Sequence, residues 1–252
     1  MRMVIPWTLR VFAWQGAWLG MLEAAGATVL LLAVLWGMGR LWGRLYRRIA
    51  AVRIHLERGH GLWAVLLARL FDQTPPRAPV ELVAYTLEEP PFFRGELMGS
   101  AVHARALRER GARVRAMISL EMIGCFSDTP ASQEFPNPAL RLLYPSVGNF
   151  IAVAGDFRQI GLVREMKGAM RRAGAIPVYS INAPGWLPGI DFSDHLNYWN
   201  AGYPAVMVTD TSFYRNKNYH TPQDTADKLD YNRMAGVVQA VFAAVQAFAP
   251  VD

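Results

Sequence analysis

The sequence contains a single cysteine, Cys125, and its first 60 residues contain no lysine. One cysteine excludes an internal disulfide bond and leaves the cellular compartment open. Residues 1–60 hold eight arginines and only two acids, so this segment accounts for the whole formal charge of +6. No basic face with interleaved aromatic residues follows, which argues against nucleic acid as a partner. No internal repeat is evident, and the length suits one sizeable domain with an appendage.

The N-terminal segment does carry a long apolar run, between Arg10 and Arg40, that only Gln15 and Glu23 interrupt. A helix needs about 20 such residues to cross the hydrocarbon of a bilayer, so the run predicts a membrane-spanning helix over about residues 11–39. The other interpretations are a buried or dimer-forming helix and a stretch of poor coding quality. Arginines are more numerous after the run than before it, which favours a cytoplasmic main body by the positive-inside rule. We therefore expect membrane association, with the side of the membrane left open.

Beyond residue 60 the pattern changes to strands that alternate with helices. Several apolar runs are continuous rather than alternating, as expected for strands of a parallel sheet that is buried on both faces. This order predicts an α/β domain over residues 61–252, with a mostly parallel sheet covered by helices on both faces and residues 1–60 as a separate arm. The predicted strands are residues 80–86, 114–124, 151–155, 176–181 and 205–210, and the predicted helices are residues 62–71, 98–110, 157–174 and 231–249.

Polar side chains stand where three of these apolar runs end. Glu88 and Glu89 follow the first run, Glu121 lies in the second, and Asp210 ends the last, ahead of a polar loop that contains His220. In such sheets functional groups gather at the carboxyl ends of the strands. Carboxylates with one imidazole suit zinc or a similar divalent ion, which lowers the pKa of bound water and polarises a carbonyl. Taken singly, each residue is also explained without a metal: the adjacent glutamates as solvated side chains, Glu121 as the partner of an arginine or a backbone cap, and His220 as a surface residue.

The most specific signal comes from four segments of the chain: AYTLEEPPFFRGELMGS, SLEMIGCFSD, DFSDHLNYWNAGYPAVMVTDT and NYHTPQDTADKLDY. In this order they resemble metallopeptidase family twenty-eight, the co-catalytic zinc aminopeptidases. The resemblance covers about residues 61–248 and implies a three-layer sandwich, in which helices cover both faces of a mixed, mostly parallel sheet. It also implies a peptide substrate and two zinc ions, and members of the family are often secreted or periplasmic.

Carried over residue by residue, the resemblance gives five positions a role in catalysis or metal binding. Glu88 matches the general base that activates the attacking water. Glu89 and His220 match two ligands of one zinc, and Glu121 matches the acidic ligand of the other. Tyr219 matches a tyrosine that stabilises the tetrahedral intermediate in some members.

Three further positions, Ser193, Asp194 and His195, match a segment that lines the substrate side of the pocket. The match assigns them no chemical step. Asp194 and His195 are equally explained as residues that support the metal ligands or the fold. The three are therefore candidates for the substrate pocket.

One part of the family's pattern is missing from this chain. Members of the family have an upstream histidine that binds one zinc and, after it, an aspartate that bridges both. Aligning the segments places Glu57 at the aspartate position, and no histidine stands at the expected distance before it. Zinc sites usually have three or four protein ligands, whereas Glu89 with His220 supplies two. Either Glu57 completes a single-metal site, or the chain is an incomplete or decayed member of the family.

Three functions remain open on this basis. The leading one is a zinc-dependent exopeptidase of the aminopeptidase type, with Glu88 as the general base. The second is a membrane-tethered binding or structural protein that keeps the scaffold without the metal chemistry. The third is a single-zinc acyl transferase resembling glutaminyl cyclases, which share the scaffold, and it requires Glu57 as a third ligand. The number of zinc ions, one or two, and the oligomeric state are left open.

Overall fold

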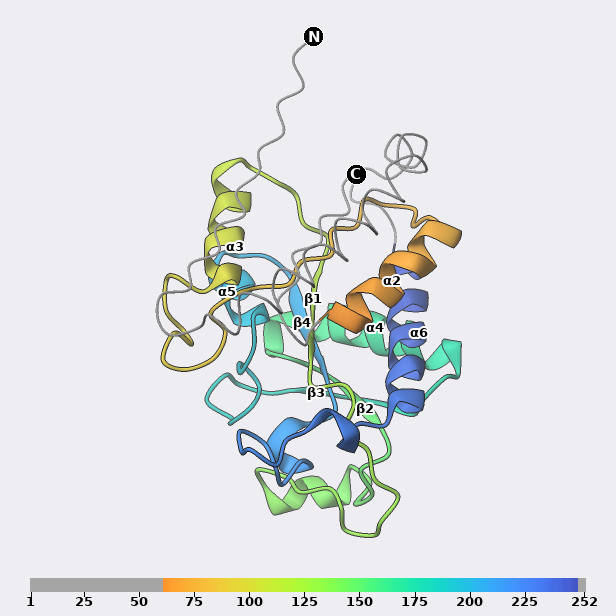
Figure 1. The fold of residues 1–252 in the computed structure, drawn as a ribbon. Helices are drawn as coiled ribbons and strands as arrows, with labels where there is room; N and C mark the ends of the chain where they lie inside the picture. Colours follow the sequence, from red (N-terminus) through yellow and green to blue (C-terminus); the bar gives the residue numbers. More distant parts are fainter. Residues whose placement is uncertain (1–60, 249–252) are drawn as a thin grey trace, which may run out of the picture. The chain divides into compact units, whose positions relative to one another are not determined.

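The computed structural model describes residues 61–248 of the chain (Figure 1). The predicted N-terminal helix at residues 11–39 and Glu57 lie outside the described residues. Within residues 61–248, no helix combines the length and the apolar character that crossing a membrane requires. The helices are α2 (Gly61–Gln73), α3 (Gly99–Glu109), α4 (Ile160–Ala173), α5 (His195–Asn200) and α6 (Tyr231–Ala247), and the strands are β1 (Met117–Glu121), β2 (Ile151–Gly155), β3 (Val178–Asn182) and β4 (Ala205–Thr209). Short 3-10 helices lie at Pro138–Leu142, Phe157–Gln159, Ser212–Tyr214 and Ala226–Lys228.

The strands form one mixed sheet in the order β1–β4–β2–β3. β1 pairs in parallel with β4, and β2 pairs in parallel with β3, whereas β4 and β2 run antiparallel. The carboxyl ends of β1 and β4 therefore meet at one end of the sheet, called the first end below. The carboxyl ends of β2 and β3 meet at the opposite end, called the second end. This topology confirms the predicted mixed sheet. Residues that follow β1 and β4 lie at the first end, and residues that follow β2 and β3 lie at the second end.

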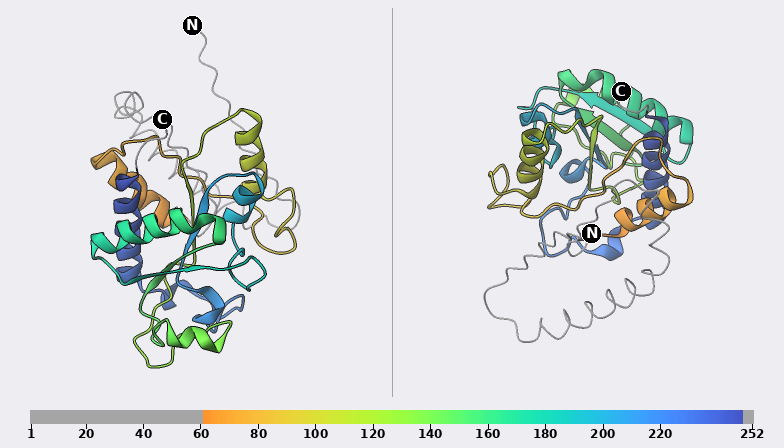
Figure 2. Two further views of the ribbon diagram at one scale, coloured as in Figure 1. Left: turned by 180° about the vertical axis from the view of Figure 1, so that it is seen from behind. Right: turned by 90° about the horizontal axis from the view of Figure 1, so that it is seen from above.

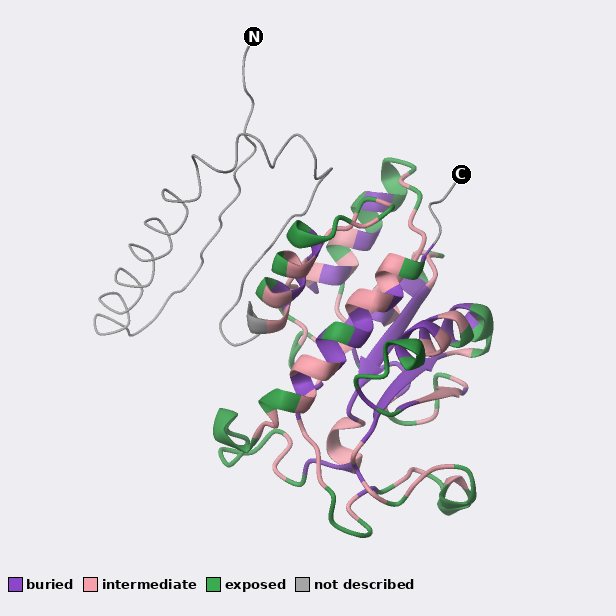
Figure 3. Ribbon diagram, turned by 90° about the vertical axis from the view of Figure 1, so that its right-hand side faces the viewer, coloured by how far each residue is buried: buried purple, intermediate pink, exposed green. Residues whose placement is uncertain are grey.

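The two central strands, β2 and β4, are buried along their whole length (Figure 3). On β4, Val206 and Val208 pack in a larger core with α2, α4 and α6, while Ala205 and Met207 pack in a smaller core with α3 and α5. Successive side chains of a strand point to opposite faces, so a strand with a core on each side reads as a continuous apolar run. Helices accordingly lie on both faces of the sheet, which makes the predicted three-layer sandwich (Figure 1 and Figure 2).

Helix α4 shows how the sequence sets the bounds of a covering helix. Just before it, the side chain of Asp156 accepts a hydrogen bond from the backbone N–H of Arg158. At its end, Gly174 takes the left-handed backbone conformation, with φ 68°, which glycine adopts at little cost because it has no Cβ. Between these signals, side chains spaced three or four residues apart, such as Met166 and Met170, are buried in the larger core.

Residues 80–86 do not form the predicted strand. The segment pairs with no strand of the sheet; instead Leu82 packs in the larger core and Tyr85 packs against the smaller one. Its alternating pattern therefore reflects contacts with both cores and not a place in the sheet. Helix α5, which the sequence did not predict, has six residues, too few to show a helical period.

Candidate active site

Three loops bring the predicted site residues together at the first end of the sheet. Glu88 and Glu89 follow the unpaired segment 80–86, Glu121 is the last residue of β1, and Tyr219 and His220 lie in the loop after β4. Since β1 and β4 are parallel neighbours that stop at the same level, the loops that follow them leave the sheet side by side. The contacts between the side chains show that the first loop joins the other two.

Glu89 and His220 form an ion pair between two of these loops, with 3.1 Å between Glu89 Oε2 and His220 Nε2. The His220 backbone is left-handed, with φ 57°, and the imidazole stacks on the Tyr219 ring with 3.9 Å between the centroids. Two ligands of a tetrahedral zinc lie roughly 3.3 Å apart when each bond is about 2.0–2.1 Å long. The pair therefore has the donors and the separation that one shared zinc ion requires.

Glu121 accepts a hydrogen bond from one serine, and a second serine contacts the first. Ser193 Oγ donates to Glu121 Oε2 at 3.0 Å, and Ser119 Oγ lies 2.7 Å from Ser193 Oγ. Burial raises the pKa of Glu121 to about 7; the Ser193 hydrogen bond opposes this rise, and the charges of Asp194 and Glu89 add to it. Ser119 was not among the predicted site residues, although a hydroxyl two residues before an acid in an apolar strand points to the same face and could have been noticed.

Glu88 lies among other acids. Burial first, and then the negative charges of Glu121, Asp194 and Glu89, raise the pKa of Glu88 to about 8. Within the described part of the chain, neither Glu88 nor Glu121 forms an ion pair with a basic side chain. Carboxylates this close disfavour one another's ionised forms, and a bound cation reverses that preference.

An apolar pocket lies beside these acids, and Glu121 and Tyr219 form part of its wall. Burial, followed by the charges of Glu121 and Glu89, raises the pKa of Tyr219 to about 12, so its hydroxyl stays protonated at neutral pH. The arrangement can hold an apolar side chain next to a polar reaction centre. Other walls of the pocket are mostly apolar and include Phe135, Phe150, Tyr179, Phe192, Met207 and Phe213.

Asp210 supports the loop that carries Tyr219 and His220. Its carboxylate accepts hydrogen bonds from the backbone N–H groups of Cys125, at 2.7 Å, and Ser212, at 3.0 Å. Burial raises the pKa of Asp210 to about 7, while these backbone hydrogen bonds oppose the rise. Asp210 thus fixes the turn after β4.

Two of the three residues predicted for the substrate pocket lie near the acids. Ser193 donates to Glu121, and the charge of Asp194 raises the pKa values of both Glu88 and Glu121. The walls of the apolar pocket nevertheless include none of residues 193–195. Their assignment to the substrate side stays a prediction.

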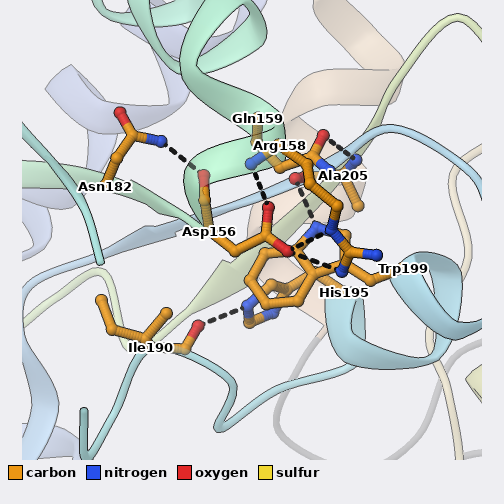
Figure 4. Close-up of polar contacts among 8 residues, drawn as sticks. All are labelled: Asp156, Arg158, Gln159, Asn182, Ile190, His195, Trp199 and Ala205. Carbon is orange, nitrogen blue, oxygen red and sulfur yellow. Dashed lines mark hydrogen bonds and ion pairs between the residues drawn. The ribbon is translucent and has the colours of Figure 1, made fainter. Parts of the chain in front are cut away.

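The third of these residues, His195, has the surroundings of a core histidine. Its Nε2–H donates to the carbonyl oxygen of Ile190 at 2.8 Å, and its ring packs edge-on against Trp199 with 4.5 Å between the centroids (Figure 4). Burial lowers the pKa of His195 to about 4, so the imidazole is neutral at physiological pH. These contacts favour the interpretation of His195 as a residue that supports the fold.

The described residues hold part of a zinc site. Glu89 and His220 have suitable donors at a suitable separation, and Glu121 is close enough for its pKa to respond to the charge of Glu89. In residues 61–248, however, no three His, Cys, Asp or Glu side chains are grouped closely enough to hold a metal ion by themselves. The additional ligand that the sequence predicts, Glu57, lies outside this range. The site residues therefore fit zinc as a partial ligand set.

The fold is an α/β sandwich that carries a cluster of acids beside an apolar pocket. The chain belongs to Peptidase family M28, whose model matches residues 59–245. This match confirms the resemblance that the four sequence segments indicated, and it makes the scaffold that of a peptidase family.

Curated relatives agree with this membership. The chain is 55% identical over 175 residues to the uncharacterized protein YfbL of Escherichia coli strain K12, an alignment that covers 69% of this chain and 53% of that protein. It is 27% identical over 156 residues to leucine aminopeptidase 1 of Ajellomyces dermatitidis, covering 62% of this chain and 34% of that protein. The chain thus spans about half the length of the first relative and about a third of the second.

Solved structures share the fold. LapB from Legionella pneumophila superimposes with a TM-score of 0.54 at 19% sequence identity, over 73% of this chain and 43% of that chain. The LapA aminopeptidase from the same organism gives a TM-score of 0.52 at 21% identity, over 71% of this chain and 43% of that chain. At these sequence identities the similarity shows that the fold is shared. The chemistry of the site has to be argued from the residues of this chain.

Proposed function

We propose that this chain is a zinc-dependent exopeptidase of the aminopeptidase type, which releases N-terminal residues from peptides. The observation that carries the proposal is the convergence of Glu88, Glu89, Glu121 and His220 beside an apolar pocket. Membership of Peptidase family M28 and similarity to proteins named leucine aminopeptidase support a peptide as the substrate.

Glu88 is the proposed general base. As a carboxylate it takes a proton from the attacking water and passes that proton to the leaving amine nitrogen. A base must lie within reach of the water that it activates. The charges that act on Glu88 come from Glu121, Asp194 and Glu89, and the first and last of these are the predicted acidic ligands of the two zinc ions. Glu88 therefore lies beside the position where an activated water would bind.

Tyr219 is the proposed donor to the tetrahedral intermediate. With its pKa raised to about 12, the phenol keeps its proton and donates a hydrogen bond to the oxygen on which negative charge develops. The same side chain lines the apolar pocket. One residue thus contacts both the side chain of the substrate and its reacting carbonyl.

The proposed zinc ligands are Glu89 and His220 for one ion and Glu121 for a second, with Glu57 as a further ligand. Zinc, when bound, lowers the pKa of a coordinated water and polarises the peptide carbonyl. Because three or four protein ligands are usual, Glu89 and His220 alone would bind zinc weakly. The proposal leaves open whether one or two zinc ions bind. Metal analysis of the full chain would determine this number.

The substitution Glu88→Gln tests the proposal most directly. The amide cannot take up the proton, and general-base catalysis contributes about 10²–10⁴-fold, so hydrolysis of aminoacyl reporter substrates should fall by that factor. The circular dichroism spectrum should not change, and the melting temperature should not fall, because the substitution removes one acid from a cluster of like charges. Glu96→Gln is the matched control, since it removes an exposed acid from the same loop and should leave the rate unchanged. Full activity of the Glu88→Gln protein would contradict the assignment.

A second candidate function is a binding or structural protein on the peptidase scaffold. The observation that favours it is the incomplete ligand group in residues 61–248. The two candidates differ in metal content after dialysis against zinc. A purified chain that retains about one or two zinc ions supports the peptidase, whereas a chain that stays free of zinc and inactive supports the binding protein.

Two further predictions depend on residues 1–60 and stay predictions. The membrane attachment rests on the apolar run at residues 11–39, and flotation of the full chain with lipid vesicles would test it. The single-zinc acyl transferase rests on Glu57 as a third ligand. If the Glu57→Ala protein keeps its zinc, that alternative is lost.

A further inference from the structure

An ion pair links the loop of Glu88 and Glu89 to the loop that borders the apolar pocket. Arg94 Nη2 donates to Asp191 Oδ2 at 2.5 Å. The Arg94 guanidinium also lies over two aromatic rings, 5.4 Å from the centroid of Phe93 and 5.7 Å from that of Phe192. Phe93 belongs to the first loop and Phe192 to the second, so Arg94 contacts both loops through charge and through ring faces.

A chain of aromatic rings continues from this contact to the third loop of the site. Phe93 packs edge-on against Phe192 with 6.1 Å between the centroids, and Phe192 lies 6.1 Å from Phe213. Phe213 in turn lies 5.7 Å from Tyr219, which stacks on His220 at 3.9 Å. The spacings are those of favourable aromatic pairs.

The contacts close into a ring around the site. His220, at the end of the aromatic chain, pairs with Glu89, and Glu89 stands five residues before Arg94 on the first loop. Three loops are thereby joined to one another. The first is joined to the second by Arg94 with Asp191 and by Phe93 against Phe192, the second to the third by Phe192 and Phe213, and the third to the first by His220 and Glu89. Removing Arg94 takes away the charged link between the first and second loops and leaves only the packing of Phe93 on Phe192.

We propose that Arg94 and Asp191 are positioning residues that hold the loop of Glu88 and Glu89 in register with the pocket. The proposal rests on the proposed function, because it concerns the placing of Glu88 against the bound substrate. An ordinary surface ion pair would contribute little. This pair differs because the Asp191 side chain is only 12% exposed.

Asp191 depends on Arg94 for its charge balance. Oδ1 of Asp191 is buried and has no hydrogen-bond partner within residues 61–248, and Oδ2 accepts from Arg94. Removing the basic partner of a largely buried carboxylate leaves that charge uncompensated, whereas removing both charges avoids that cost. Loss of Arg94 should therefore disturb the loops more than loss of both charges together.

The chain offers a matched control at the second end of the sheet. Arg158 Nη2 lies 2.6 Å from Asp156 Oδ2, with side-chain exposures of 68% and 13%, close to the 50% and 12% of Arg94 and Asp191 (Figure 4). The two pairs have the same chemistry and similar burial. They differ in that Arg158 and Asp156 lie two residues apart in one turn at the second end, whereas Arg94 and Asp191 lie 97 positions apart and join two loops at the site.

The experiment compares Arg94→Met with Arg158→Met in the full chain. A displacement of about 1 Å at a reaction centre can cost on the order of 10²-fold, so Arg94→Met should lower kcat for an aminoacyl reporter by about 10- to 100-fold with KM nearly unchanged. Arg158→Met should change kcat less than about 2-fold. The double variant Arg94→Met with Asp191→Asn should recover much of the lost kcat. Equal kcat values in Arg94→Met and Arg158→Met, or no recovery in the double variant, would overturn the proposal.

Hydrogen exchange gives a second measurement that needs no activity. The loop has its own backbone bonds, from Phe92 N–H to Glu89 O at 3.0 Å and from Gly95 N–H to Phe92 O at 2.8 Å. These amides should exchange at least about 10-fold faster in Arg94→Met and at the wild-type rate in Arg158→Met. Unchanged exchange would show that Arg94 does not hold the loop. An inactive wild-type protein would refute the proposed function, and the exchange rates would still decide whether the link exists.

Discussion

The two ends of the sheet carry similar residues in opposite electrostatic situations. At the second end Asp156 is well supplied with donors: the backbone N–H of Arg158 donates at 2.9 Å and its side-chain Nε at 2.7 Å (Figure 4). Asn182 Nδ2 donates to the backbone oxygen of Asp156 at 2.8 Å, and His195 donates to Ile190. The carboxylate of Asp156 and the side-chain amide of Asn182 each have a complementary partner close by, as expected of groups that stabilise a fold. The buried His195 ring bonds through Nε2, while its Nδ1 has no hydrogen-bond partner within residues 61–248.

At the first end the acids face one another. Burial and mutual repulsion raise the pKa values of Glu88 to about 8 and of Glu121 to about 7, and among the described residues His220 is the basic group that pairs with this cluster, through Glu89. Such a cluster is unfavourable for the fold by itself, and groups of this kind concentrate at functional sites. Both ends contain a carboxylate and a histidine. They differ because the carboxylate of Asp156 is paired with an arginine, whereas Glu88 and Glu121 have no basic partner among the described residues.

Removing the histidine of the first end should have the largest effect. His220→Ala deletes a proposed zinc ligand. The loss of a residue that merely orients a metal ligand costs about 10–100-fold, so hydrolysis should fall at least about 100-fold. The free energy of unfolding should change by less than about 0.5 kcal/mol, because the side chain is 47% exposed. Elemental analysis and reporter hydrolysis check the result; a variant with full zinc content and full rate would remove His220 from the site.

The histidine of the second end should instead govern stability in acid. Burial lowers the pKa of His195 from 6.5 to about 4, so the unfolded chain takes up a proton at a pH where the folded chain does not. The stabilising contribution is therefore present above pH 6.5 and is lost as the pH falls from 6.5 towards 4. A shift of this size corresponds to about 3 kcal/mol.

Urea unfolding at several pH values would measure this contribution. The variant His195→Phe should lack the part of the acid destabilisation that belongs to His195, while His220→Ala should keep it. Identical pH profiles of unfolding free energy in the wild type and His195→Phe would show that His195 ionises alike in both states.

The smallest effect is expected from a pair of polar substitutions, one at each end. Ser119→Ala removes the hydroxyl behind Ser193 and so loosens Glu121, and kcat should fall by about 10-fold, as for residues that support a metal ligand. Asn182→Ala removes a hydrogen bond to Asp156 and should cost about 1 kcal/mol of stability without changing kcat. Steady-state kinetics and thermal melts separate the two. A lower kcat in Asn182→Ala with a normal rate in Ser119→Ala would reverse the assignment of the two ends.

Most of the secondary structure could be predicted because its signals are local. The strands at residues 151–155 and 205–209 were found to within one residue, since each is buried on both faces and reads as an unbroken apolar run. The predicted strand at residues 80–86 was wrong. Alternating apolar residues indicate which side chains are buried, and an extended segment that packs against two cores has the same alternating pattern as a strand in a sheet. Six-residue α5 gave no period to detect.

The sequence predicted which residues form the candidate site, but it did not predict the contacts that join the loops carrying them. Glu88, Glu89, Glu121 and His220 were identified from segments that resemble the family, and the structure brings them to one place. The link between Arg94 and Asp191 was not found, because its partners lie 97 positions apart and no local pattern joins them.

The sequence by itself determined the α/β class, the family and the residue types of the site, because periodicity and short motifs are properties of neighbouring residues. Only the tertiary structure decided that β2 runs antiparallel to β4, and hence that Glu121, which ends β1, and Asp156, which follows β2, lie at opposite ends of the sheet. The physical reason is that strand direction and charge compensation depend on contacts between distant segments. Those contacts form when the two cores pack against the sheet.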